Sequence, residues 1–214
     1  MKGRIPVIGV TGPSGAGKSL FCSGFARHGY LILDCDAIYH GMIDRETPLT
    51  AELANVFGQS VISPDGSVDR AALAAVVFAP GAEEKRLLLN KITHAYVKKE
   101  IYRQLKSAPG AGYRGCVIDA PLLFEAGLGR GCDLTVALLA DRQTRLGRIR
   151  ERDGLPDDRL EMRLGASPDD SFYAKKAGVT IINDGNPEKL VSEADAIVLR
   201  FGAAETANGS RQKS

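Results

Sequence analysis

The 214-residue sequence has almost no surplus of charge and no long run of basic residues. Its 28 Lys and Arg residues against 26 Asp and Glu residues give a formal net charge of +2 at pH 7. A nearly neutral chain lacks the basic surface with which proteins bind nucleic acids or anionic membranes. We therefore expect neither a nucleic acid nor a membrane among its main partners.

Cysteine is scarce, and its spacing is not that of a metal site. The four cysteines, Cys22, Cys35, Cys116 and Cys132, form no C-x-x-C pair. The first three adjoin apolar segments, which favours buried free thiols over metal ligands or disulfides. Free thiols are typical of a reducing compartment, so we expect a cytoplasmic protein.

The sequence also lacks a long apolar run and a charged, apolar, cleavable leader. No apolar run approaches the length needed to cross a bilayer, and the chain enters a strand-like segment almost at once. We expect a soluble, unprocessed protein. The composition, with 44% hydrophobic residues, is that of ordinary globular proteins, and the length predicts one α/β domain with insertions.

The segment Val7–Ser19 has the spacing that most directly indicates a chemistry. An apolar, strand-like stretch runs into the pattern G-x-x-x-x-G-K-S, which is typical of a phosphate-binding loop. Gly12, Gly15 and Gly17 let the backbone turn tightly, so that its N–H groups reach polyphosphate oxygens. The alternative is a glycine-rich turn before a helix that binds nothing.

The end of this pattern predicts how a nucleotide would be held. Lys18 would reach the β- and γ-phosphates, and the Ser19 hydroxyl would bind Mg²⁺ at the positive end of the following helix. The residues that we expect at ATP from this segment are Gly12, Pro13, Ser14, Gly15, Ala16, Gly17, Lys18, Ser19 and Leu20.

Short apolar segments predict the strands of a parallel sheet that is buried on both faces. Residues 37–104 are mostly helical in pattern, and we interpret them as an insertion that forms a substrate wall. A break at Pro109–Gly112 marks the return to the core. A final helix from Pro187 to about Leu199 precedes a polar tail. The expected strands are Val7–Val10, Tyr30–Leu33, Cys116–Asp119, Leu134–Leu139 and Val179–Asn183.

Acidic residues follow two of the expected strands, at the edge of the sheet where ligands collect. Asp34 or Asp36 can accept the proton of an acceptor hydroxyl, as a kinase carboxylate does. The alternative is that one of them, most simply Asp36, caps the helix that begins at Ala37. Asp119 resembles a second acid that organises Mg²⁺ and its waters, although an Asp before Pro121 also begins turns.

Arginines are dense between Asp141 and Arg152. Arg145, Arg148 and Arg152 fall on one broad helical face, so several guanidinium groups can point together at a nucleotide. A solvated charged face is the alternative interpretation. His94 lies within a long helical pattern, where a lone histidine is more often structural than functional.

Several segments together resemble the dephospho-CoA kinase family. The resemblance runs from Ile8 to about Leu155 and depends on the phosphate-binding loop and on four further segments. These are Leu33-Asp34-Cys35-Asp36-Ala37-Ile38 with His40, Gly66-Ser67-Val68-Asp69-Arg70 through Phe78, Leu89-Asn90-Lys91-Ile92-Thr93-His94, and Asp119-Ala120-Pro121-Leu122-Leu123-Phe124-Glu125.

The resemblance implies transfer of the ATP γ-phosphate, with Mg²⁺, to the ribose 3′-hydroxyl of dephospho-CoA. It also implies a three-layer α/β/α fold of the P-loop NTPase type, with a parallel five-stranded sheet, a helical substrate-binding insertion and a lid. We expect the core in residues 1–36, 113–140 and 177–201, the insertion in 37–112, the lid in 141–176 and a disordered tail in 202–214.

Position by position, the resemblance implies catalytic roles for Asp36, Lys18 and Arg148, with Arg148 and Arg152 also at ATP. Ser19 would bind Mg²⁺, and Asp119 would act on it through water. We expect a monomer or a weak homo-oligomer. The residues expected at the acceptor are Asp36, His94, Asp119, Pro121, Leu122 and Glu125.

The chain departs from the family pattern at a few positions. Ala95 replaces the proline after the histidine, and Ala177-Gly178 replaces the Ala-Asp before the last strand. Pro13-Ser14 in the loop also occurs in uridine and nucleotide kinases. Another small-metabolite or nucleoside kinase, or a nucleotide-binding module without an acceptor, is therefore the alternative function.

Overall fold

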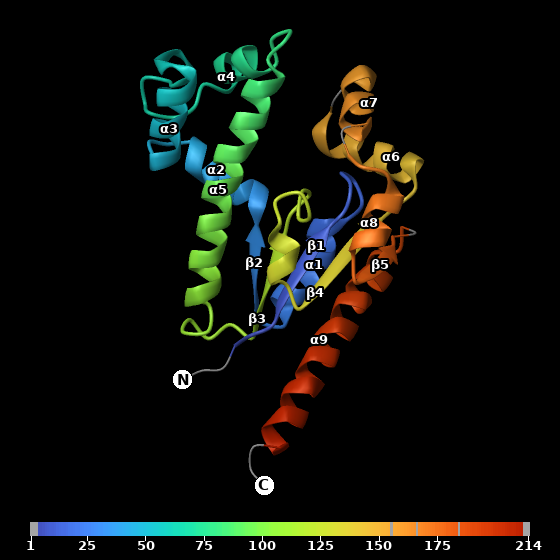
Figure 1. Ribbon diagram of the computed structural model, residues 1–214. Helices are drawn as coiled ribbons and strands as arrows, with labels where there is room; N and C mark the ends of the chain where they lie inside the picture. Colours follow the sequence, from blue (N-terminus) through green and yellow to red (C-terminus); the bar gives the residue numbers. More distant parts are fainter. Residues whose placement is uncertain (1–3, 155, 166, 184, 212–214) are drawn as a thin grey trace. The chain divides into compact units, whose positions relative to one another are not determined.

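A five-stranded sheet forms the centre of the larger of two compact units. The computed structural model describes residues 4–154, 156–165, 167–183 and 185–211. One unit comprises residues 1–33 and 105–214, and the other comprises residues 34–104. The strand order is β2-β3-β1-β4-β5 (Figure 1). The strands are β1 (Val7–Thr11), β2 (Tyr30–Asp34), β3 (Gly115–Asp119), β4 (Leu134–Leu139) and β5 (Val179–Ile182).

The first strand of the chain lies in the middle of the sheet. β1 pairs in parallel with β3 and β4, and β4 pairs in parallel with β5. The register sets Val10 beside Asp119 and Thr11 beside Ala137. The carboxyl ends of these strands therefore meet at one edge, where the loop after β1 begins.

Alternating residues of β4 face two separate apolar cores, as the period of a strand requires. Val136 and Leu138 pack in the core beneath α1 (Lys18–Arg27) and α9 (Pro187–Arg211). Ala137 and Leu139 pack on the other side with Tyr173 of α8 (Asp170–Lys176). Helices on both faces of the sheet confirm the predicted three-layer architecture.

Two further helices follow β4. α6 (Arg142–Asp153) begins at Asp141, whose side chain accepts a hydrogen bond from the Thr144 N–H, and it ends at Gly154, which has a left-handed backbone. Ile149 of α6 packs with Leu160 and Leu164 of α7 (Asp157–Gly165). This small apolar cluster joins the two helices within the range predicted to form a lid. A short 3₁₀ helix, η2 (Leu128–Gly131), precedes β4.

The unit of residues 34–104 is helical and has its own core. Side chains from its helices bury Ile43, Leu49, Leu53, Val61 and Leu73 together. The helices are α2 (Cys35–Ile43), α3 (Pro48–Phe57), η1 (Gln59–Val61), α4 (Arg70–Val77) and α5 (Glu83–Ser107), the last of which continues beyond the unit.

Local chemistry explains where these helices start. Thr47 and Thr50 cap the start of α3, because the side chain of each accepts a hydrogen bond from the backbone N–H of the other. Pro48 occupies the first turn, where its missing N–H removes no helical hydrogen bond. Asp69 caps α4 by accepting hydrogen bonds from the N–H groups of Ala71 and Ala72. Pro48 therefore marks the start of a helix.

The structure differs from the sequence-based expectations at the end of the chain. α9 continues to Arg211, so residues 202–211 are helical, whereas the sequence led us to expect a disordered tail from residue 202. Alanine-rich sequence favours helix even when it is polar. Residues 212–214 lie outside the described range. α8 was not predicted, and the functional domain boundaries, including the lid at 141–176, stay predictions.

Cysteine burial agrees in part with expectation. All four cysteines are free; Cys22 and Cys116 are buried, and Cys35 and Cys132 are half-buried. Within the described residues, no helix is both long enough and apolar enough to cross a membrane.

Candidate active site

The loop between β1 and α1 has a backbone that only glycine fits well. Gly12, Gly15 and Gly17 have φ values of 134°, 80° and 99°, which side chains disfavour. A Cβ on Gly12 would also lie 2.1 Å from the carbonyl oxygen of Leu138. α1 begins after Gly17 without a side-chain cap, which leaves its first N–H groups available to an anion.

The Lys18 side chain folds back over this loop. Its ammonium donates hydrogen bonds to the carbonyl oxygens of Gly12 at 2.9 Å and Pro13 at 3.2 Å. Ser19 is exposed in the first turn of α1, and Leu20 beside it is 40% exposed. The loop, the ammonium and the hydroxyl are thus gathered at one helix N-terminus, as the sequence predicted.

Two residues far along the chain support the loop. The buried Asn183 amide donates from Nδ2 to the Ala16 carbonyl at 2.8 Å, and its Oδ1 lies 3.4 Å from a guanidinium nitrogen of Arg148. Arg148 also donates to the Gly15 carbonyl at 3.1 Å. Arg148 was predicted at ATP from the sequence, whereas no role was predicted for Asn183. Its position directly after the last strand, on the ligand edge of the sheet, was the available signal.

Arg152, which was also predicted at ATP, forms an ion pair with the adjacent Asp153 at 2.7 Å. Its side chain is 56% exposed. Arg148 is therefore hydrogen-bonded to the phosphate-binding loop, whereas Arg152 is ion-paired with Asp153.

The end of β3 is fastened to the end of β1. The Ala120 N–H donates to the Val10 carbonyl at 3.0 Å, and the Thr11 hydroxyl donates to the Pro121 carbonyl at 3.1 Å. Asp119, with 8% of its surface exposed, lies beside Val10 in the register. The predicted acceptor residues Asp119 and Pro121 are therefore held next to the strand that leads into the phosphate-binding loop.

The other predicted acceptor residues of this segment face solvent. Leu122 is 42% exposed, and Glu125 is exposed as well. Both remain accessible to a substrate that approaches this edge of the sheet.

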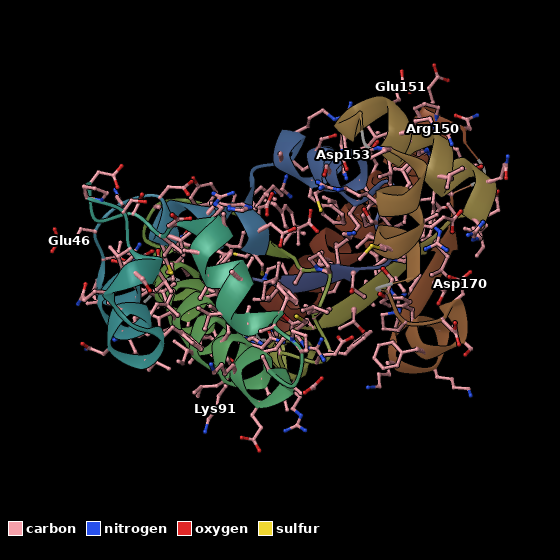
Figure 2. The ribbon with its side chains drawn as sticks, turned by 90° about the horizontal axis from the view of Figure 1, so that it is seen from above. Glu46, Lys91, Arg150, Glu151, Asp153 and Asp170 are labelled. Carbon is pink, nitrogen blue, oxygen red and sulfur yellow. The ribbon has the colours of Figure 1, made fainter. Side chains whose placement is uncertain are left out.

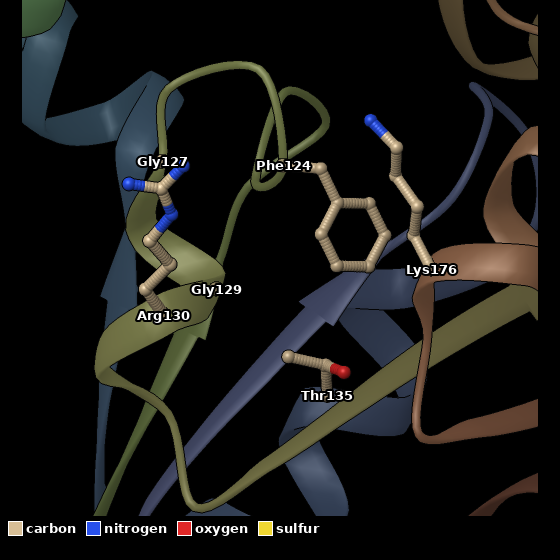
Figure 3. A pocket seen from close by; sticks show the side chains of 6 residues that line it. All are labelled: Phe124, Gly127, Gly129, Arg130, Thr135 and Lys176. Atoms are coloured by element: carbon tan, nitrogen blue, oxygen red, sulfur yellow. The ribbon is translucent and has the colours of Figure 1, made fainter.

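A pocket of ≈ 350 Å³ opens between this segment and α8. In Figure 3 the Phe124 ring hangs over Thr135 of β4, with Lys176 of α8 on one side and η2 on the other. A Cβ at Gly129 would lie 3.2 Å from this ring, so glycine gives the ring its room. The lining residues are Phe124, Gly127, Gly129, Arg130, Thr135 and Lys176.

Asp34, the last residue of β2, and Asp36 in α2 have different environments. Asp34 caps α2, because its Oδ1 accepts a hydrogen bond from the Ala37 N–H at 2.9 Å. Asp36 lies in the first turn of that helix and is exposed. The alternative in which Asp36 caps the helix is therefore wrong, because the helix begins two residues earlier than expected.

His94 lies on α5 two residues from Ile92 and Tyr96 of the helical core, and residues two apart in a helix point to different faces. It is half-buried. Its predicted role at the acceptor stays a prediction.

The thiols of Cys116 and Cys132 do not suit nucleophilic chemistry. Burial raises the pKa of Cys116 to about 11, and burial together with the nearby Asp133 raises the pKa of Cys132 to about 12. A thiol with so high a pKa is protonated at neutral pH and is a poor nucleophile. Among the described residues, no group of three or more His, Cys, Asp or Glu side chains is arranged to hold a metal ion.

Comparisons with known proteins agree on one family. The model of the dephospho-CoA kinase family matches residues 6–189. A dephospho-CoA kinase of Corynebacterium glutamicum is 38% identical over 191 residues, which is 89% of this chain and 94% of that protein.

Solved structures share the fold. The crystal structure of TT1252 from Thermus thermophilus has a TM-score of 0.76 and 27% identity, and the match covers 92% of this chain and 98% of that one. A dephospho-CoA kinase from Campylobacter jejuni has a TM-score of 0.59 and 21% identity, over 93% and 98% of the two chains. The family match spans most of the sequence, including the phosphate-binding loop and the segment after β3, and this chain therefore belongs to the dephospho-CoA kinase family.

Proposed function

We propose that this chain transfers the γ-phosphate of ATP to the ribose 3′-hydroxyl of dephospho-CoA, with Asp36, Lys18 and Arg148 as its catalytic residues. The observation that carries this proposal is that Lys18 and Arg148, which are far apart in the sequence, both donate hydrogen bonds to the loop of residues 12–15. Two permanent cations at one loop suit a triphosphate, whose charge must be neutralised during transfer.

On the donor side, the loop backbone and the N-terminus of α1 bind phosphate oxygens through N–H groups. The Lys18 ammonium exchanges part of its hydrogen bonding to Gly12 and Pro13 for the β- and γ-phosphates. Arg148 stabilises the phosphoryl group in transfer, and Arg152 contributes to the ATP site. The loop residues that the sequence predicts at ATP, from Gly12 to Leu20, form the rest of the donor site in this proposal.

On the acceptor side, Asp36 orients the 3′-hydroxyl and accepts its proton. Because Asp34 supplies the cap of α2, the carboxylate of Asp36 is not used by the helix and is exposed to a substrate. Asp119, Pro121, Leu122 and Glu125 contact the acceptor from the segment after β3, and His94 contacts it from α5.

Mg²⁺ fits the oxygen ligands at this site. Ser19 offers a hydroxyl, and Asp119 offers a carboxylate for a bound water. Mg²⁺ is commonly held by one or two protein oxygens together with substrate phosphates, so a larger cluster of protein ligands is not needed. When bound, the ion neutralises charge on the β- and γ-phosphates.

Residues 141–176 act as a lid that excludes water, and residues 37–112 form the wall for the acceptor. ATP and dephospho-CoA are the partners that we propose, for a monomer or weak homo-oligomer. Four free cysteines support a reducing compartment, which we propose to be the cytoplasm.

A coupled assay of ADP release tests the function. Dephospho-CoA should stimulate ADP release, and mass spectrometry should find coenzyme A as the product. Uridine, cytidine and adenosine serve as competing acceptors, and preference for one of them would replace this proposal with a nucleoside kinase. Failure of every hydroxyl substrate to stimulate ATP consumption would instead favour a binding module.

A further inference from the structure

α6 passes directly over the tip of the phosphate-binding loop, and Arg145 is the residue at the crossing. A Cβ added to Gly15 would lie 2.8 Å from the carbonyl oxygen of Arg145 and 2.9 Å from its Cα. One helical turn later, Arg148 donates to the Gly15 carbonyl. The same face of α6 thus carries both arginines to this loop.

The two arginines differ in whether their guanidinium N–H groups have hydrogen-bond acceptors. Both hydrogen bonds given for Arg148 go to protein oxygens, those of Gly15 and Asn183. The Nε of Arg145 is buried and has no hydrogen-bond partner among the described residues. Guanidinium groups stay charged in proteins, so a buried N–H of this group without an acceptor is unfavourable.

Electrostatic effects on Tyr173 indicate what else lies near the Arg145 side chain. Burial raises the pKa of Tyr173 to about 12, the charge of Glu125 adds to this rise, and Arg145 opposes it. Arg145 and Glu125, a residue that we place at the acceptor, are therefore both within electrostatic range of the Tyr173 phenol of α8. The backbone of Arg145 thus lies against the donor loop, and its side chain lies within electrostatic range of Tyr173.

We propose that Arg145 binds the terminal phosphate of the nucleotide and contacts the phosphoryl group as it is transferred, while Arg148 in addition fixes the loop. A planar guanidinium matches a phosphate through two parallel hydrogen bonds, and Nε–H is one of the donors of that fork. An oxygen of the terminal phosphate supplies the acceptor that Nε lacks. This inference rests on the proposed function for the identity of the nucleotide.

Binding of ATP and ADP in the presence of Mg²⁺, measured by calorimetry without any acceptor, tests the proposal. Loss of one charge-assisted contact to the γ-phosphate should weaken ATP binding to Arg145→Gln by about 10- to 100-fold, with ADP binding unchanged within about twofold. Arg145→Lys keeps the charge but loses the fork, and we expect an intermediate loss. If Arg145→Gln does not fold, Arg145→Lys alone gives the comparison.

Arg150→Gln is the matched control, because Arg150 lies on the same helix and points outward (Figure 2). It should bind ATP and ADP like the original protein. Thermal unfolding separates a ligand contact from a structural one: without nucleotide, Arg145→Gln should unfold no earlier than the original protein, whereas its stabilisation by ATP should be smaller.

Unchanged ATP affinity in Arg145→Gln would overturn the proposal. Equal losses for ATP and ADP would also overturn it, because they would mean that Arg145 only supports the loop. The comparison needs no dephospho-CoA, so its outcome is independent of the acceptor assay. An inactive protein that still distinguishes ATP from ADP through Arg145 would refute the proposed function alone.

Discussion

Asn183 donates a hydrogen bond from its side-chain amide to the backbone carbonyl of Ala16, at 2.8 Å and across 167 residues of sequence. A Cβ on Gly17 would lie 2.4 Å from the same amide nitrogen. The phosphate-binding loop is therefore shaped by the end of the last strand as well as by its own glycines. This relationship gives a direct test of loop geometry.

Replacing Asn183 with alanine should loosen the loop without removing a phosphate ligand. The Ala16 carbonyl and a guanidinium N–H of Arg148 lose a partner, so we expect a loss of about 1–3 kcal/mol in the free energy of unfolding. ATP affinity should fall as well, because the loop N–H groups are no longer held in place. Urea unfolding and calorimetry measure the two effects.

Asn186→Ala is the control for this variant. Asn186 accepts a hydrogen bond from the Lys189 N–H at the start of α9, so its loss should cost about 1 kcal/mol of stability through the cap. ATP binding should stay normal. If both variants lose ATP affinity in proportion to their stability, Asn183 has no specific effect on the loop.

We expect Asp34 to have a structural role and Asp36 a catalytic one. Asp36→Asn should abolish turnover, because an amide cannot accept the proton of the hydroxyl, and should leave ATP binding and stability largely unchanged. Asp34→Ala should lower the free energy of unfolding by about 1 kcal/mol through loss of the α2 cap. Steady-state kinetics and urea unfolding of the two variants provide the measurements. Near-normal activity of Asp36→Asn would remove Asp36 from the mechanism.

Lys18→Ala should weaken ATP binding and reduce the rate of transfer. The variant loses the cation that is bound to the Gly12 and Pro13 carbonyls, and a lost charged contact of this kind costs about 1.5–3 kcal/mol, or roughly 10- to 100-fold in affinity. Lys175→Ala, an exposed lysine on α8, is the control. Unchanged affinity and rate in Lys18→Ala would contradict our assignment of the phosphate site.

Alkaline pH should destabilise the protein through Cys132. The pKa of this thiol is about 12 in the folded protein, against an ordinary value of 9.0. Between these values the unfolded chain releases the thiol proton and the folded chain keeps it, so the free energy of unfolding falls as pH rises. The contribution is fully present below pH 9 and is lost as pH passes 12.

Urea unfolding at a series of pH values from 8 to 10.5 checks this expectation. Cys132→Ser has no thiol to ionise at this position and should show a smaller fall in stability over the same range. Cys116, whose pKa is about 11, contributes in the same direction and remains in both proteins. Identical slopes for the two proteins would show that Cys132 does not titrate as proposed.

The order of strands and helices could largely be predicted from the sequence because apolar runs and glycine breaks are local signals. Each predicted strand was confirmed within about two residues, and the mostly helical pattern of residues 37–104 was confirmed as well. α8 was missed because its seven residues include only one buried side chain, that of Tyr173, which is too few to produce a helical period.

The candidate site could be predicted only where one short segment carries the chemistry. The G-x-x-x-x-G-K-S pattern predicted a tight glycine turn followed by a helix, and the structure has positive φ at these glycines and a helix that begins at Lys18. It could not locate Asn183, because that contact depends on how the last strand packs against the first. The alternative of a capping acid named Asp36 before Asp34, because both are good capping residues and the choice depends on where β2 ends.

The division of the chain has a consequence for the order in which the protein folds during synthesis. β1 is made first but pairs with β3 and β4, which leave the ribosome more than a hundred residues later. The helical unit of residues 34–104 is continuous in sequence and has its own core. It can therefore fold before β3 and β4 have been synthesised and can pair with β1. The nascent chain therefore completes its helical unit before its nucleotide site, and an interrupted translation product would carry the first without the second.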